Sequence, residues 1–334
     1  MNAGSNYSFK EFVLWTRTNI YYLVIISTIP VILYEIVGWK WLGVPWVPVA
    51  LIGTGAAFIV GFKNTQTYNR MWEARIIWGG IVNTSRTWGI MVKDFIRSAN
   101  REEAAQYHHT LIYRHIAWLT ALRFQLRETR RWENVKVKSY NIEYRKYYKI
   151  PEWENKLSDD IAPYISAEEW ERVSKTKNPA AQIIALQSAQ LRELHEQGHI
   201  DTLCYIELEN TLKDLYTEQG RSERIKNYPY PRQFASINLF FIRLLVVILP
   251  LGMLNEFSHL GPHCVWLSIP FSVIVSWVFT SLEQVGESTE NPFEGGPNDI
   301  PITQMSRNIE FDLREMLGET ELPPAVVPVH DIVL

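Results

Sequence analysis

The chain has 334 residues, of which 47% are hydrophobic and 13% aromatic. Its formal net charge is only -3, from 33 Lys and Arg against 36 Asp and Glu, which argues against nucleic acid as a partner. The two cysteines, Cys204 and Cys264, lie far apart in the sequence and can form neither a disulfide framework nor a four-ligand zinc site. We therefore expect no cofactor and no redox chemistry.

Four stretches of the sequence are long and apolar enough to cross a bilayer as helices. They are residues 20–37, 41–62, 234–254 and 264–282. In the second stretch, Pro48 favours a helix that starts only after it. The third stretch contains one charged residue, Arg243, for which Glu35 or Glu73 is the expected partner.

The basic residues predict which parts of the chain face the cytoplasm. All but six of the 33 Lys and Arg lie within residues 63–232, and such an excess marks a cytoplasmic segment. Four spans then place both termini on the cytoplasmic side. The expected divisions are an N-terminal part with two spans, a cytoplasmic region, two further spans and a cytoplasmic C-terminal segment. Their bounds are residues 1–62, 63–233, 234–282 and 283–334.

The cytoplasmic region has the apolar periodicity of helices almost throughout. Helices are predicted at residues 65–97, 101–127, 179–197 and 202–219. Asn178 is a suitable cap for the third helix, and Gly198 and Gly220 are natural stops for the third and fourth. Residues 130–163 show no such period and are predicted to be a surface connection. A short amphipathic helix is expected around residues 309–317.

A stripe of side chains in the second span is the first candidate for a functional site. Thr54, Phe58 and Phe62 lie four residues apart and share one face of a helix. Small residues interleave with this face, namely Gly53, Gly55, Ala56, Ala57 and Gly61. Small residues let several copies of a membrane helix approach closely, and phenylalanines on a central axis would form a hydrophobic constriction that gates by dewetting. Packing against lipid or against the protein's own core explains the same pattern.

The residues that follow the stripe carry a family resemblance. Residues 61–75 read GFKNTQTYNRMWEAR, and together with Trp78-Gly79 they resemble the signature of the bestrophins, particularly the bacterial members. Asn291-Pro292-Phe293 and residues 309–313 follow the order of the same family. The resemblance implies an all-α integral membrane protein, with four transmembrane helices per subunit and a helical cytoplasmic insert. It further implies a homopentamer around a central pore that conducts small ions, a channel rather than an enzyme, placed in the bilayer of a bacterial inner membrane.

The resemblance also implies roles for individual residues. The pore neck would consist of Thr54, Phe58 and Phe62, although the family usually has an apolar residue where Thr54 stands. A second constriction, in the cytoplasmic region, would lie at Ile184, with Ile183 on the same helix as the alternative. A set of signature residues is expected to anchor the junction between membrane and cytoplasm and the subunit contacts. These residues are Tyr68, Arg70, Trp72, Glu73 and Arg75.

Two properties of the family leave alternatives open for this chain. Its animal members are known as chloride channels, whereas some bacterial relatives favour small cations, so chloride and sodium are both candidate ions. In animal members an acidic run after Asn-Pro-Phe helps bind calcium. The matching residues 294–299 read EGGPND, which contains too few carboxylates to predict a calcium site.

Two other classes of function compete with the channel. Residues 195–199 read HEQGH and fit the HExxH pattern of zinc hydrolases, in which two histidines on one helical turn bind the metal. Gly198 weakens the helix that this motif needs, and His108 with His115, on another helix face, has no evident third ligand. A coupled transporter would show internal repeats and spans interrupted by polar residues, and these signs are weak here.

Overall fold

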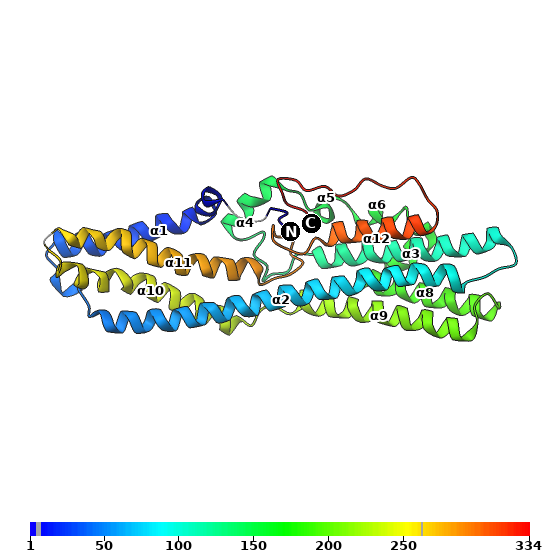
Figure 1. Cartoon of the computed structure of the whole chain (residues 1–334), viewed down its shortest axis with the longest axis horizontal. Helices are drawn as coiled ribbons and strands as arrows, with labels where there is room; N and C mark the ends of the chain where they lie inside the picture. The colour runs from blue at the N-terminus through cyan, green and yellow to red at the C-terminus, as the bar shows by residue number, and fades with distance from the viewer. Residues whose placement is uncertain (5–7, 262) are drawn as a thin grey trace. The chain divides into compact units, whose positions relative to one another are not determined.

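The computed structural model describes residues 1–4, 8–261 and 263–334 and consists of helices joined by short connections (Figure 1). The helices are α1 (Phe9–Glu35), η1 (Lys40–Leu42), α2 (Trp46–Phe95), α3 (Arg101–Arg127), α4 (Ser139–Tyr144), η2 (Arg145–Tyr147), α5 (Pro151–Glu154), α6 (Leu157–Ile161), α7 (Ala167–Ser174), α8 (Pro179–Glu196), α9 (Thr202–Asn227), α10 (Arg232–Ser258), η3 (Cys264–Leu267), α11 (Ser268–Thr289) and α12 (Ile302–Met316). Within the described ranges, extended pairing is limited to two isolated bridges, Asn2 with Ile332 and Val329 with Ile332. The predicted all-α class is confirmed.

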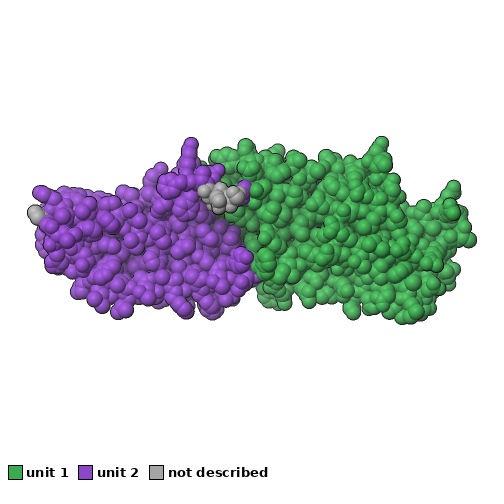
Figure 2. Space-filling model, in the orientation of Figure 1, with its two compact units in different colours: residues 1–3, 71–228, 292–334 green, residues 4–70, 229–291 purple. Residues whose placement is uncertain are grey.

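The chain forms two compact units, which Figure 2 shows in different colours. Unit 1 comprises residues 1–3, 71–228 and 292–334, and unit 2 comprises residues 4–70 and 229–291. Four helices, α1, α2, α10 and the η3–α11 segment, are long and apolar enough to cross a membrane. The number of candidate spans agrees with the prediction.

In unit 2, α1, α10 and α11 pack against one another. The inner faces of this bundle are apolar, with Leu23, Val60 and Ile242 in one buried cluster. The outer faces are apolar too, as the exposed side chains of Ile25 and Ile29 on α1 illustrate. Apolar surface on both faces is typical of a bundle whose solvent is lipid.

The first two long helices differ from their predicted bounds. α1 begins at Phe9, eleven residues before the predicted start, because Ser8 and Glu11 form a capping box at its N-terminus. α2 begins at Trp46, so the prediction of a start after Pro48 was wrong. Pro48 lies in the first turn, where a missing N–H breaks no helical hydrogen bond. α2 then continues for 50 residues and joins the second predicted span to the first predicted cytoplasmic helix.

In unit 1, α3 contacts α8, α9 and α12. Its observed bounds coincide with the predicted residues 101–127, and the side chain of Asn100 caps its N-terminus. Gly198, with a φ of 81°, follows the end of α8, as predicted. Gly220 does not end a helix, because α9 continues through it to Asn227. That prediction was wrong.

Two further predictions, on residues 130–163 and on the partner of Arg243, differ from the observed packing. Residues 130–163 hold four short helical segments rather than an open surface connection, and Val135, Ile150 and Ile161 are buried there. Arg243 is exposed in the described chain. The carboxylates expected to pair with it have other partners: Glu35 pairs with Lys40 at 3.1 Å, and Glu73 pairs with Arg224.

Candidate functional site

The stripe of Thr54, Phe58 and Phe62 lies on the part of α2 that belongs to unit 2, and the described residues leave most of this face open. The Phe58 side chain is 76% exposed and that of Phe62 43%, and Thr54 is exposed as well. The opposite face of the same helix is buried, with Val49 at 2% and Val60 at 1% exposure. α2 therefore buries one face within unit 2 and leaves the phenylalanine face available.

Two of the small residues beside this face, Gly55 and Gly61, do not serve packing within the described chain, whereas Ala56 is buried in the core of unit 2. A Cβ atom added at Gly55 or at Gly61 would meet no other atom within 4 Å. A glycine in a helix interior costs about 0.5–1 kcal/mol relative to alanine, so two of them on an uncovered face call for another reason. Close approach of a second helix is the usual one in membranes.

Thr54 is the polar member of the stripe. Its hydroxyl donates to the carbonyl of Ala50, at 3.0 Å, within the same helix. The hydroxyl oxygen keeps its acceptor sites, so this level of the stripe can hold water where an apolar side chain could not.

The signature residues lie along the next turns of α2. Glu73 forms an ion pair with Arg224 of α9, and the guanidinium of Arg75 lies 3.6 Å from the sulfur of Met1. Tyr68 and Trp72 are 61% and 47% exposed. Aromatic side chains with this much open surface are suited to an interfacial or subunit contact, which is the role that the sequence predicts for them.

The isoleucines proposed for the second constriction both lie on α8. Ile183 is fully buried in the core of unit 1, whereas Ile184 retains 9% of its surface. Ile184 is thus the better placed of the two to contribute to a surface.

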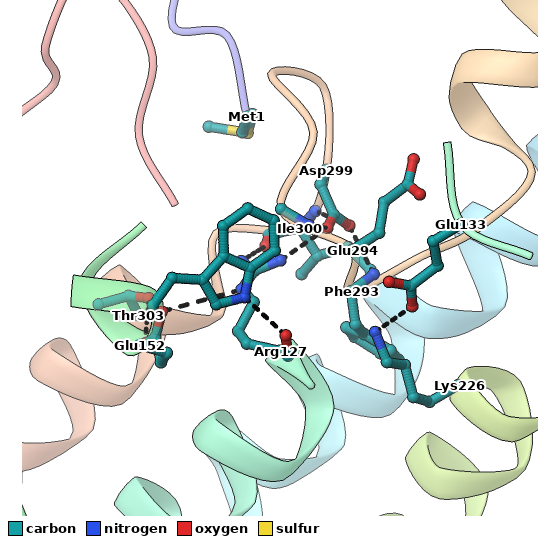
Figure 3. A network of polar contacts seen from close by, with 12 residues as sticks. Met1, Arg127, Glu133, Glu152, Lys226, Phe293, Glu294, Asp299, Ile300 and Thr303 are labelled. Atoms are coloured by element: carbon teal, nitrogen blue, oxygen red, sulfur yellow. Dashed lines mark hydrogen bonds and ion pairs between the residues drawn. The ribbon is translucent and has the colours of Figure 1, made fainter. Parts of the chain in front are cut away.

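A network of buried charges occupies the end of unit 1 that holds the 293–300 loop, and sequence patterns did not predict it (Figure 3). The guanidinium of Arg127, a residue only 1% exposed, lies 2.7 Å from a carboxylate oxygen of Asp299 and 4.0 Å from one of Glu152. Arg123 forms an ion pair with the same Glu152, and Lys226 does so with Glu133. Burial of each charge is tolerable because an opposite charge accompanies it.

Asp299 also holds the loop that leads to it. Its carboxylate accepts backbone N–H bonds from Phe293 at 2.9 Å, Gly295 at 2.8 Å and Ile300 at 2.7 Å. Phe293 has a φ of 71°, a conformation that a bulky side chain rarely adopts, and it is fully buried. The bonds to Asp299 keep this strained loop in place, and Arg127 supplies the positive charge that the carboxylate needs.

Glu294 is the one carboxylate of this network with a strongly raised pKa. Burial, followed by the like charges of Asp299 and Glu133, raises its pKa to about 8, while the N–H of Asn134, which donates to it at 2.9 Å, and Lys226 act in the opposite direction. Glu294 is 2% exposed. At neutral pH its side chain is therefore mainly a neutral carboxylic acid.

The HExxH residues do not form the helical pair that a zinc hydrolase needs. α8 ends at Glu196, so His199 lies beyond the helix. Each Nδ1 is hydrogen-bonded to a carbonyl oxygen, that of His195 to Ile200 and that of His199 to Arg97, both at 2.9 Å. The described residues contain no group of three or more His, Cys, Asp or Glu side chains placed to hold a metal ion. This arrangement does not favour the hydrolase.

The sequence as a whole decides the family. A family model described as Bacterial/Fungal Bestrophin protein matches residues 13–315 of this chain. The chain belongs to the bestrophin family. The matched residues include both the phenylalanine stripe and the buried Arg127 network, whose partner Asp299 lies between α11 and α12.

Curated relatives and solved structures agree with this bestrophin assignment. The Escherichia coli K12 protein named voltage-dependent anion channel-forming protein YneE is 27% identical over 282 residues, which are 84% of this chain and 80% of that protein. A Ralstonia nicotianae protein of the same designation, RSc3414, is 25% identical over 279 residues, 82% of this chain and 78% of that one. The crystal structure of a bacterial bestrophin homologue from Klebsiella pneumoniae matches with a TM-score of 0.75 at 23% identity, over 91% of this chain and 99% of that chain. This likeness shows that the fold is that of a bestrophin.

Proposed function

We propose that this protein is an ion channel that conducts small monovalent anions such as chloride across a cell membrane. The observation that supports this most is the uncovered, glycine-flanked face of α2 with Phe58 and Phe62, in a chain whose relatives carry the name of anion channel-forming proteins. Five copies of the chain would place this face around a central axis. The phenylalanine rings would then form a neck in which their partly positive edges contact the ion, and the Thr54 hydroxyls would form a ring that can hold water.

The rest of the pathway follows from the same proposal. Ile184 would form the second constriction, and the signature residues from Tyr68 to Arg75 would hold the subunits together near the membrane surface. Both termini would lie in the cytoplasm of a bacterial cell, with unit 2 in the inner membrane. The abundance of basic residues in residues 63–232 supports this orientation.

Purified protein in planar bilayers tests the function. Single-channel currents are expected, and under a potassium chloride gradient they should reverse near the equilibrium potential of chloride. Reversal near the potassium potential would mean a cation channel, and well-folded protein without current would exclude a channel. As a check on the hydrolase, channels with His195→Ala or His199→Ala should carry currents of wild-type size, since neither histidine belongs to the proposed neck or to the proposed constriction at Ile184.

Shortening the neck side chains tests the pathway. Phe58→Ala and Phe62→Ala should each raise the single-channel conductance by about twofold or more, because a smaller apolar side chain widens a hydrophobic constriction and lowers its dewetting barrier. Phe240→Ala is the matched control, since Phe240 is a 64% exposed phenylalanine of unit 2 on α10. Equal conductance in all three variants and the wild type would mean that the stripe does not line the pore.

A further inference from the structure

Lys63, the residue that follows Phe62 on α2, points away from the phenylalanine face. Lys63 is 3% exposed, whereas Phe62, its neighbour on α2, is 43% exposed. Successive side chains on a helix lie about 100° apart, so one can face outward while the next faces the bundle. A lysine buried at this point lies one peptide bond from the ring that the proposed function places in the pore.

Lys63 is buried together with two carboxylates, that of Glu283 on α11 and that of Glu290, which directly follows this helix. Its ammonium nitrogen lies 2.8 Å from an oxygen of Glu283 and 3.7 Å from an oxygen of Glu290. The side chains of Glu283 and Glu290 are 11% and 14% exposed. They are seven residues apart, and Glu290 still has a helical backbone conformation, so both side chains lie on one side of the chain and a single cation reaches both.

Further contacts bring α2 and α11 together at the same level. The amide of Asn64 donates to the carbonyl of Leu282 at 3.1 Å, and the hydroxyl of Thr289 donates to that of Thr67 at 3.2 Å. Gly286 lies between the two glutamates, and a Cβ atom there would collide with the Asn64 side chain. The two helices therefore approach each other closely at this point.

The charges make Lys63 the critical member of this group. Its ammonium is shared by two carboxylates, so both ion pairs depend on this one side chain. Neutralising Lys63 would take away the ammonium that pairs with both carboxylates, which is unfavourable because removing one partner of a buried ion pair costs stability. The inner end of this part of α2 would then have to turn or move away, and Phe62 would move with it because both residues belong to one rigid helix.

We propose that Lys63, through its ion pairs with Glu283 and Glu290, is a positioning residue that fixes the direction of the Phe62 ring. It thereby sets the width of the pore neck at Phe62. This inference rests on the proposed channel function. Lys63 itself does not face the pore. The contact of Phe62 with Phe234 of α10, whose ring centres are 5.9 Å apart, holds the ring from the side, and the ion pairs hold the helix beneath it.

Single-channel recording of four variants tests the proposal in bilayers where the wild type is measured first. Lys63→Met should change the conductance by about threefold or more, whereas Lys63→Arg, which keeps the charge, should stay within about 1.5-fold of the wild type. Lys40→Met is the matched control, because Lys40 also pairs with a glutamate of unit 2 but is 57% exposed, and its conductance should be unchanged. Glu283→Gln, which leaves Lys63 paired with Glu290, should give an intermediate change.

Repeating the Lys63 substitution in channels that already carry Phe62→Ala shows whether Lys63 acts through Phe62. When Phe62 is already alanine, adding Lys63→Met should change the conductance by less than about 1.5-fold, because coupled positions are not additive. An equal effect with and without the ring would overturn the proposal, as would wild-type conductance in Lys63→Met and Glu283→Gln channels. If Lys63→Met does not assemble, Glu283→Gln takes its place. It should change the conductance of the wild type but have a smaller effect on the conductance of Phe62→Ala channels. Absence of current from the wild type itself would instead refute the channel function, and this inference with it.

Discussion

Replacing Arg127 by methionine is expected to lower the free energy of unfolding by about 3–5 kcal/mol, the cost of removing one partner from a buried ion pair. Asp299 and Glu152 would both lose the guanidinium that lies 2.7 Å and 4.0 Å from them. Asp299 would keep its three backbone donors but lose its guanidinium partner. Urea unfolding of the full chain in detergent, followed by tryptophan fluorescence, measures the loss.

The matched control is Arg192→Met. Arg192 lies on α8 and pairs with Glu196 at 3.9 Å, with both side chains more than 60% exposed. Exposed pairs of this kind contribute at most about 1 kcal/mol, so this variant should unfold close to the wild type. Similar losses in the two variants would show that the burial of Arg127 does not matter. Adding Asp299→Asn to Arg127→Met should restore part of the stability, since one uncompensated charge is removed as well.

The Arg127 network shows a limit of prediction from sequence. Arg127 and Asp299 are 172 positions apart, and no local pattern relates the last residue of a helix to an acidic residue in a distant glycine-rich loop. The sequence around Asp299 did show a short turn with few carboxylates. The cation that pairs with these carboxylates is determined by the packing of α3 against the 293–300 loop, which is a tertiary feature.

Elements with a strong local signal were predicted well. α3 has Asn100 at its start and an unbroken apolar period, and its predicted and observed bounds agree. α2 was divided in the prediction because the sequence changes from apolar to polar after Phe62. That change indicates where a helix leaves an apolar environment and not where its backbone ends. Without a proline, the chain had no reason to stop there.

The stripe itself was recognised from its spacing, but the ion pair behind it was not. Thr54, Phe58 and Phe62 repeat every fourth residue, which predicts a shared face in any helix. Lys63 stands at the end of the second apolar stretch, and Glu283 at the end of the fourth. Charges that flank two spans at the same end are a usable signal for such a pair, because spans with the same boundary bring their flanking residues to one level.

The second large effect is expected from pH at Glu294. Its pKa is about 8 in the folded chain against an ordinary value of 4.5. The folded chain therefore keeps this proton while the unfolded chain loses it. The stabilising contribution is complete below about pH 4.5 and declines as the pH rises towards 8, by about 1.4 kcal/mol for each pH unit. Above that range no further loss is expected from this group.

Glu294→Gln removes this dependence and keeps an oxygen that can accept the N–H of Asn134. The stability of the variant relative to the wild type should rise by about 3 kcal/mol between roughly pH 5.5 and pH 8. Taking the difference cancels other titrating groups, such as His115, whose burial lowers its pKa to about 3. Glu171→Gln is the matched control, because Glu171 is exposed and pairs only at the surface with Lys175. The stabilities of Glu294→Gln and the wild type could instead change with pH in the same way over this range. Glu294 would then be ionised in the folded chain, with Lys226 rather than a proton balancing its charge.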